Sequence, residues 1–198
     1  GIAGGWNWKE MKTYIVSKVW DPFTVISKKI GKVPYMILRL ANRSDGVLAA
    51  VLRYSGVKHV KTVIDGITVN ELHADDKIKP LFGILKPLGA IDEINRFIGW
   101  VAAHRADMLK GENRERFFSK EEIEEGLKAN TGMMKDATTG SMTSREVIYK
   151  QVADDLAKWN KGIVDVGVGF GLFNAEAAQA WNTEWYVPFF RLAEKQIG

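Results

Sequence analysis

The sequence predicts a mainly α-helical fold, an irregular multi-helix bundle with one small β-hairpin. Apolar residues recur every three or four positions, most clearly between residues 145 and 165. Ser119 and Glu122 form a capping-box pattern that marks a helix start. Asp65-Gly66, between two short β-branched runs, predicts a two-residue hairpin turn. We therefore expect helix in over half of the residues, and strand in fewer than about a tenth.

The 198 residues are enough for one hydrophobic core. We predict a single domain spanning residues 1–198. Its parts are a basic N-terminal helical part at 1–56, a hairpin-and-loop part at 57–90, and a helical part at 91–198 with a mobile connector at 131–142.

The N-terminal part contains an amphipathic stretch at residues 8–20. Its apolar stripe is Trp8, Met11, Ile15 and Val19. Short apolar helices are expected next at 22–31, 34–40 and 47–54, because prolines or a Ser-Asp-Gly break separate these segments.

The middle of the chain carries the predicted turn at Asp65-Gly66 and a short buried turn of helix between Pro80 and Pro87. Between them, residues 71–76 contain metal-capable side chains. Their spacing matches neither a zinc-protease helix nor a calcium-binding loop, so we expect a solvated polar loop.

Three longer helices are predicted after residue 90, followed by a short fourth helix at 175–181. One begins at Asp92 and contains His104, which we expect at the edge of the core. The second begins at Ser119. The third begins at the second capping-box pattern, Thr143 with Glu146, and is ended by a glycine-rich stretch that lacks the spacing of a nucleotide-binding fingerprint. Pairs at i and i+4, Asp154–Lys158 and Lys161–Asp165, are expected on its outer face.

An aromatic segment near the C-terminus is predicted to act as a structural clasp. A proline holds it extended, and its rings are too apolar to remain in water. The clasp residues are Trp181, Trp185, Tyr186, Pro188, Phe189, Phe190 and Arg191.

The net charge of +4 is unevenly distributed. Residues 1–64 hold 11 Lys or Arg against 3 Asp or Glu, whereas residues 65–198 hold 17 against 21. The basic third is either a set of solvated helix faces or a surface for an anionic partner such as nucleic acid or acidic lipid. The candidate residues are Lys9, Lys12, Lys18, Lys28, Lys29 and Lys32.

No catalytic, cofactor-binding or metal-binding pattern is visible. The chain has no Cys and three His, and it lacks GxSxG, P-loop and HExxH motifs. We therefore expect no enzyme activity and no cofactor. The sequence contains no transmembrane run and no signal peptide, and its opening residues indicate a piece of a larger protein.

The order of several segments resembles a conserved helical region of the large polyvalent proteins of tailed bacteriophages and mobile elements. The resemblance covers residues 21–191. Its segments are Leu85-Lys-Pro-Leu88, Arg96-Phe97, Ala102-Ala-His-Arg105, Gly111-Glu-Asn-Arg-Glu-Arg116, Ser119-Lys-Glu-Glu122 and Trp185-Tyr-Val-Pro-Phe-Phe-Arg191.

The resemblance implies a non-enzymatic structural or interaction module that is packaged in the virion and delivered into the host cytoplasm with the genome. Its partners would be other domains of the parent polyprotein or virion proteins. One alternative is a module that contacts nucleic acid or a membrane surface through the basic N-terminal third. Another is a fragment of an enzyme whose catalytic residues lie elsewhere.

Overall fold

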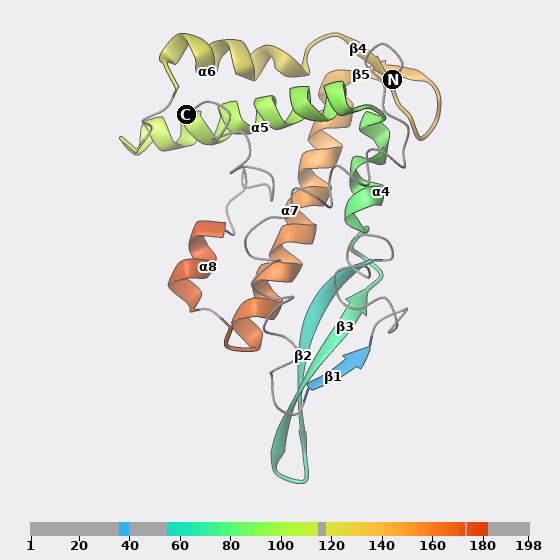
Figure 1. Cartoon of the computed structure of the whole chain (residues 1–198), viewed down its shortest axis with the longest axis vertical. Coiled ribbons are helices and arrows are strands. Elements are labelled where there is room, and N and C mark those ends of the chain that lie inside the picture. Colours follow the sequence, from blue (N-terminus) through green and yellow to red (C-terminus); the bar gives the residue numbers. More distant parts are fainter. Residues whose placement is uncertain (1–35, 40–54, 115–117, 173, 182–198) are drawn as a thin grey trace. The chain divides into compact units, whose positions relative to one another are not determined.

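A computed structural model describes residues 36–39, 55–114, 118–172 and 174–181. Of this part of the chain 57% is helical, and the remainder includes a three-stranded sheet and a two-stranded hairpin (Figure 1). The prediction of a mainly helical fold with a small hairpin is confirmed for the described residues. The strands are more numerous than predicted.

Contacts divide the chain into two compact units, which we describe separately. Of the described residues, 85–154 belong to the first unit, and 36–39, 55–84 and 155–181 belong to the second. Helix α7 (Arg145–Gly169) supplies residues to both, because the division falls between Asp154 and Asp155.

The first unit is built on two helices, α5 (Ile91–Gly111) and α6 (Lys120–Leu127), with the start of α7. Its shorter elements are η3 (Lys86–Leu88), η4 (Lys128–Asn130), β4 (Met133–Lys135) and β5 (Met142–Ser144). The capping box predicted for α6 is present. The Glu122 backbone N–H donates to Ser119 Oγ at 3.1 Å, and the Ser119 N–H donates to Glu122 Oε1 at 3.1 Å.

An aromatic cluster fills the core of the first unit. Phe97 and Tyr149 meet edge to face at 5.2 Å between ring centroids, and Trp100 lies 5.5 Å from Tyr149. His104 lies edge-on to Trp100 at 4.7 Å and is half-buried, as predicted for a histidine at the core edge. The cluster joins α5 to the first turns of α7.

Within the connector predicted at 131–142 the structure contains a β-hairpin, and the mobility of this segment stays a prediction. β4 and β5 pair antiparallel from Met133↔Ser144 to Lys135↔Met142. The Asp136 side chain accepts the Thr138 N–H at 2.8 Å and closes the loop. Turn residues of this segment supply the hydrogen bonds of a tight loop.

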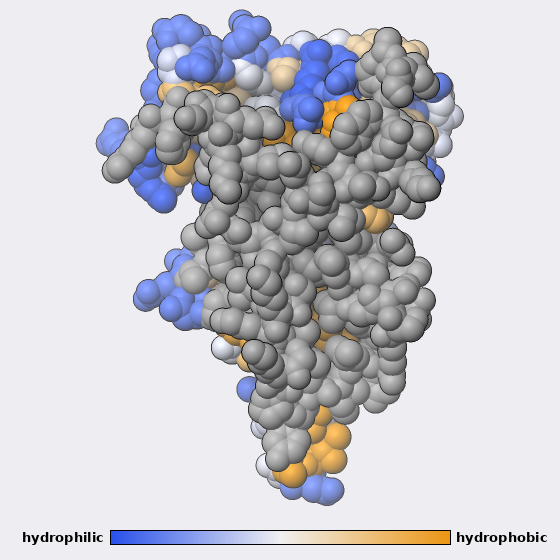
Figure 2. Space-filling view, viewed as in Figure 1, coloured by the Kyte–Doolittle hydropathy of each residue, from blue (hydrophilic) through white to orange (hydrophobic). Residues whose placement is uncertain are grey.

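The second unit contains β2 (Gly56–Ile64) and β3 (Ile67–Asp75), joined at the predicted turn. Asp65 and Gly66 have φ values of 50° and 78°, as a type I′ turn requires. The strands pair antiparallel from Ile64↔Ile67 to Gly56↔Asp75, so they are longer than the sequence predicted. Exposed apolar residues lie beside the turn, where Figure 2 shows hydrophobic colour.

Strand β1 (Met36–Arg39) corrects the helix predicted at 34–40. It pairs parallel with β3, from Met36↔Asn70 to Arg39↔His73. A short apolar run fits a helix and a strand equally well, and here a neighbouring strand decides the outcome. The sheet order is therefore β1-β3-β2.

Helices complete the described part of the second unit. They are α4 (Leu81–Leu85), whose last residue belongs to the first unit, the remainder of α7, and α8 (Ala175–Trp181). α4 confirms the short turn of helix predicted between Pro80 and Pro87. The most deeply buried side chains of this unit include Leu72 on β3 with Trp159 and Ile163 on α7. As predicted, glycines end α7, and Gly171 has a φ of +69°.

Candidate functional site

The segment after β3 forms a fixed turn at the open end of the hairpin. Asp75 Oδ1 accepts the Lys77 N–H at 3.1 Å, and Asp75 O accepts the Ile78 N–H at 3.0 Å. The Ile78 carbonyl in turn accepts the Gly56 N–H at 2.8 Å. Asp75 therefore sets the position of Lys77 beside the start of β2.

Helix α7 approaches β2 closely at Gly162. A Cβ at this position would lie 2.6 Å from the backbone oxygen of Val57 and 3.2 Å from Ile78 Cδ1. Only the absence of a side chain permits this approach. Around Gly162 the helix surface is mostly buried, and Lys158, Lys161 and Asp165 form its exposed stripe.

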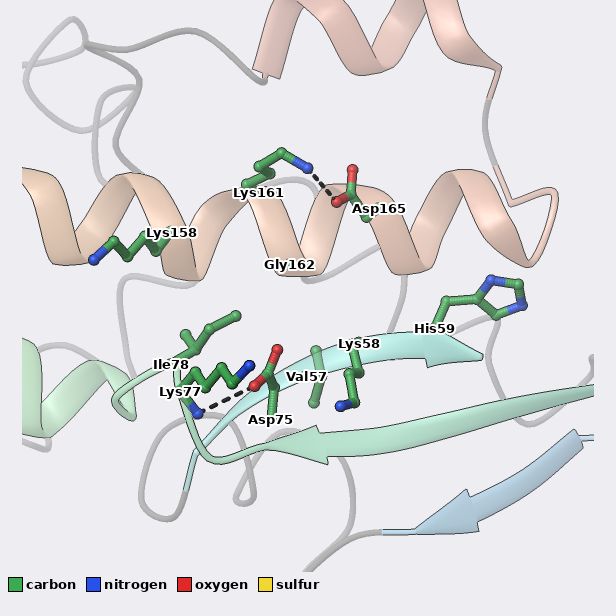
Figure 3. Close-up of a pocket in the computed structure, with 10 residues that line it drawn as sticks. All are labelled: Val57, Lys58, His59, Asp75, Lys77, Ile78, Lys158, Lys161, Gly162 and Asp165. Atoms are coloured by element: carbon green, nitrogen blue, oxygen red, sulfur yellow. Dashed lines mark hydrogen bonds and ion pairs between the residues drawn. The ribbon is translucent and has the colours of Figure 1, made fainter. Parts of the chain in front are cut away.

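A cavity of about 470 Å³ lies where these parts meet. Figure 3 shows its wall formed by α7, by β2 and by the turn that follows β3. The lining residues are Val57, Lys58, His59, Asp75, Lys77, Ile78, Lys158, Lys161, Gly162 and Asp165. We call this cavity the lysine pocket.

Positive charge exceeds negative charge in the lysine pocket. Four lysines face two aspartates, a formal charge of +2 with His59 neutral. Lys161 pairs with Asp165 at 2.7 Å. The other lysines, Lys58, Lys77 and Lys158, form no ion pair with the described part of the chain.

Lys158 does not form the ion pair that the sequence predicted for it with Asp154. Asp154 accepts Lys150 Nζ at 3.2 Å, one turn earlier on the helix, instead of Lys158. Lys79, just outside the pocket, is paired with Asp155 at 3.0 Å. Three of the lysines that line the pocket are therefore not paired with a carboxylate of the described residues.

His59 is held at one side of the pocket. Its Nε2 donates to Asn70 Oδ1 at 3.0 Å, and its ring meets Phe170 edge to face at 4.8 Å. The ring is thus fixed by neighbours on β3 and just after α7. It contributes wall surface to the pocket.

The pocket has the composition of a binding site for an anion. Ammonium groups attract phosphate oxygens strongly and attract them more where part of the solvent is excluded. Among the described residues, no group of three or more His, Asp or Glu is placed to hold a metal ion. The solvated loop predicted at 71–76 is wrong for residues 71–75, which lie in β3 and are buried or half-buried. Within it, His73 Nε2 contacts Glu71 Oε2 at 2.7 Å.

A second polar cluster, in the first unit, is structural. Arg145 donates from Nε to Glu93 Oε1 at 2.6 Å and from Nη1 to the Thr131 carbonyl at 2.6 Å. The buried Tyr149 hydroxyl donates to Glu93 Oε1 at 2.8 Å. The cluster connects the first turns of α5 and α7 to Thr131, the residue that follows η4.

The pKa values of this cluster follow from its geometry. Burial alone would raise the pKa of Glu93, but the hydrogen bonds from Arg145 and Tyr149 outweigh it and the pKa lies below its usual value. The hydrogen bond to Glu93 raises the pKa of Arg145. Burial and the same carboxylate raise the pKa of Tyr149. The lowered pKa of Glu93 and the raised pKa of Arg145 both follow from contacts that favour the charged forms of the ion pair.

The site residues predicted from the sequence lie outside the described residues. They are the basic surface of Lys9, Lys12, Lys18, Lys28, Lys29 and Lys32, and the clasp of Trp185, Tyr186, Pro188, Phe189, Phe190 and Arg191. Trp181 ends α8. Both predictions therefore stay predictions. Sequence reasoning missed the lysine pocket because its lysines come from three separate segments.

Comparisons with protein-family models, with curated proteins and with solved structures find no match to this chain. In the part of the chain that the structure describes, no helix is both long enough and apolar enough to cross a membrane.

Proposed function

We propose that this protein is a non-enzymatic module that binds the phosphates of DNA through the lysine pocket. One observation supports this most strongly. Lys58, Lys77 and Lys158 line one cavity, and none of the three has a carboxylate partner among the described residues. Phosphate contacts of this kind supply sequence-independent affinity for nucleic acid.

We also propose that the module belongs to a large polyprotein of a phage or mobile element, packaged in the virion and delivered with the genome. The resemblance of its segments to polyvalent proteins supports this context. A module carried beside a packaged genome meets DNA phosphates at high concentration. We further propose that the whole chain folds as an irregular multi-helix bundle. Helices α5, α6 and α7 would belong to it.

Fluorescence anisotropy with labelled single-stranded and duplex DNA tests the binding. The test variant carries Lys58→Gln, Lys77→Gln and Lys158→Gln, which remove charge and keep side-chain length. The matched control carries Lys120→Gln, Lys128→Gln and Lys135→Gln, three exposed lysines outside the pocket. Both variants change the net charge of the chain equally.

We expect affinity to fall steeply as salt rises from about 50 to about 200 mM, because binding releases counterions. The pocket variant should lose at least about tenfold in affinity at low salt, and its salt slope should decrease by about 2 to 3. If both variants lost affinity equally, DNA binding would depend on the total charge of the chain and not on the pocket. Binding to anionic liposomes without binding to DNA would assign the pocket to lipid headgroups.

A further inference from the structure

A cleft in the first unit, separate from the lysine pocket, lies between α5 and α6. It has a volume of about 620 Å³ and a mainly apolar surface. The α5 wall carries Arg96, Gly99 and Ala103, which share one helix face by their spacing. The α6 wall includes Ile123 and Gly126.

The two helices already touch along one side of this cleft. A Cβ on Gly126 would lie 2.7 Å from Ala103 Cβ, so the absent side chain at 126 is required for α5 to pack on α6. Gly99 is different. A Cβ there would meet nothing within 4 Å, so no described contact requires a glycine in the middle of this helix. Glycine destabilises a helix interior, and at position 99 its effect is to keep the cleft open.

The rim of the cleft is acidic. Glu121, Glu122 and Glu125 line it, and none forms an ion pair within the described residues. The capping box and the helix dipole account for acidic residues in the first turn of α6. They do not account for Glu125, which lies beyond that turn and repels Glu121 at i,i+4 spacing.

Among the described residues that line the cleft, Arg96 is the one cation, and it is already engaged. Arg96 Nε donates to the Ala129 carbonyl at 2.7 Å, and Arg96 Nη2 lies 3.5 Å from the Thr131 carbonyl. Arg96 therefore satisfies carbonyls in and after η4 and leaves the glutamates unneutralised. An apolar floor with an acidic rim is complementary to an apolar stripe flanked by lysines.

We propose that the α5–α6 cleft docks a lysine-bearing amphipathic helix of a partner polypeptide. The small residues at 99, 103 and 126 allow a third helix to approach to the usual interhelical distance. Its apolar stripe covers the floor, and its lysines meet Glu121 and Glu125. This site is independent of the lysine pocket, so either proposal can fail without the other.

Binding of two synthetic helical peptides to the full chain tests the proposal. Both carry Leu and Ala on one face, and the other face carries Lys in the first peptide and Glu in the second. Two variants probe the cleft: Gly99→Leu fills it, and Glu121→Gln with Glu125→Gln neutralises its rim. The matched controls are Gly111→Leu, and Glu124→Gln with Asp107→Asn, none of which lines the cleft.

We expect the lysine peptide to bind at least about tenfold more tightly than the glutamate peptide at low salt. Gly99→Leu should weaken its binding by about tenfold or more, and the rim variant by about fivefold, with the rim effect lost at high salt. Circular dichroism checks that each variant is folded, and Gly99→Gln replaces Gly99→Leu if it is not. The proposal is overturned if the lysine peptide does not bind, if both peptides bind equally, or if filling the cleft leaves binding unchanged.

Discussion

Gly162 sets the geometry of the lysine pocket by allowing α7 to approach β2. We predict that Gly162→Ala lowers the free energy of unfolding by about 1–3 kcal/mol, because the new methyl group meets the backbone oxygen of Val57 at 2.6 Å. Gly99→Ala is the matched control. Its methyl group meets nothing within 4 Å, so alanine should stabilise the helix by up to about 1 kcal/mol. Urea unfolding measures both, and effects of the same sign would contradict the prediction.

Glu93 should make stability depend on pH. Its pKa in the folded protein lies below the usual value of 4.5, so its ion pair stabilises the fold above that pH and loses this effect as pH falls below it. Glu93→Gln should therefore be less stable than the native chain near pH 7, and the difference should shrink below about pH 4.5.

Arg145→Met tests the same ion pair from its other side. The Arg145 and Glu93 side chains are only 13% and 17% exposed, so removing the cation leaves a poorly solvated carboxylate. We expect a loss of about 2–4 kcal/mol near pH 7, measured by urea unfolding at pH 7, 5 and 3. A loss that is constant across these pH values would show that the ion pair contributes nothing.

The lysine pocket shows which contacts could be predicted from residue spacing and which could not. Spacing predicted the Lys161–Asp165 pair, and the structure forms it. Spacing also assigned Lys158 to Asp154, but a lysine at either i−4 or i+4 can pair with an aspartate. Because Asp154 pairs with Lys150, Lys158 is left without an ion pair in the described part of the chain, and it lines the same cavity as Lys58, about a hundred positions away in the sequence. Only the fold brings these two residues together.

Among the elements, the β4–β5 hairpin differs most from its sequence prediction, and it gives a further test. Asp136 accepts the Thr138 N–H at 2.8 Å, and the Ala137 N–H donates to the Pro87 carbonyl at 3.0 Å. We predict that native proteolysis spares residues 133–144, because a protease needs an extended, accessible backbone. Asp136→Ala should lower stability by about 1 kcal/mol and increase cleavage there. Rapid cleavage of the unaltered chain in this loop would support a mobile connector.

The elements that were predicted correctly carry strong local signals. The capping box of α6 and the Asp65-Gly66 turn are each defined by a few adjacent residues, so the sequence alone was sufficient. β1 carries no such signal. Its four residues become a strand through pairing with β3, and Met36 lies opposite Asn70 in a contact that local periodicity does not encode.

At the scale of the whole molecule, α7 is the long helix that supplies residues to both compact units. Its first turns bury Tyr149 and Val152 in the first unit, and its later turns bury Trp159 and Ile163 in the second. A single helix that supplies core residues to both units couples their stabilities, because breaking its backbone affects two cores together. The basic N-terminal surface and the aromatic clasp remain separate predictions for residues outside the described ranges.

We therefore predict that a break in the middle of α7 destabilises both units. Asp154→Pro removes a helix hydrogen bond and places the proline ring against the carbonyl of Lys150, at a cost of about 3 kcal/mol or more. Asp154→Ala is the control, because it removes only the exposed Lys150–Asp154 pair, which contributes at most about 0.5 kcal/mol.

Hydrogen exchange distinguishes the outcomes of this last test. In the proline variant, amides of α5 and amides of the β2–β3 hairpin should both lose protection, whereas the alanine variant should keep it in both places. The two readouts lie in different units and neither is adjacent to residue 154, so local fraying around the proline does not mimic the result. Loss of protection in one unit alone would mean that the units fold independently and that α7 does not couple them.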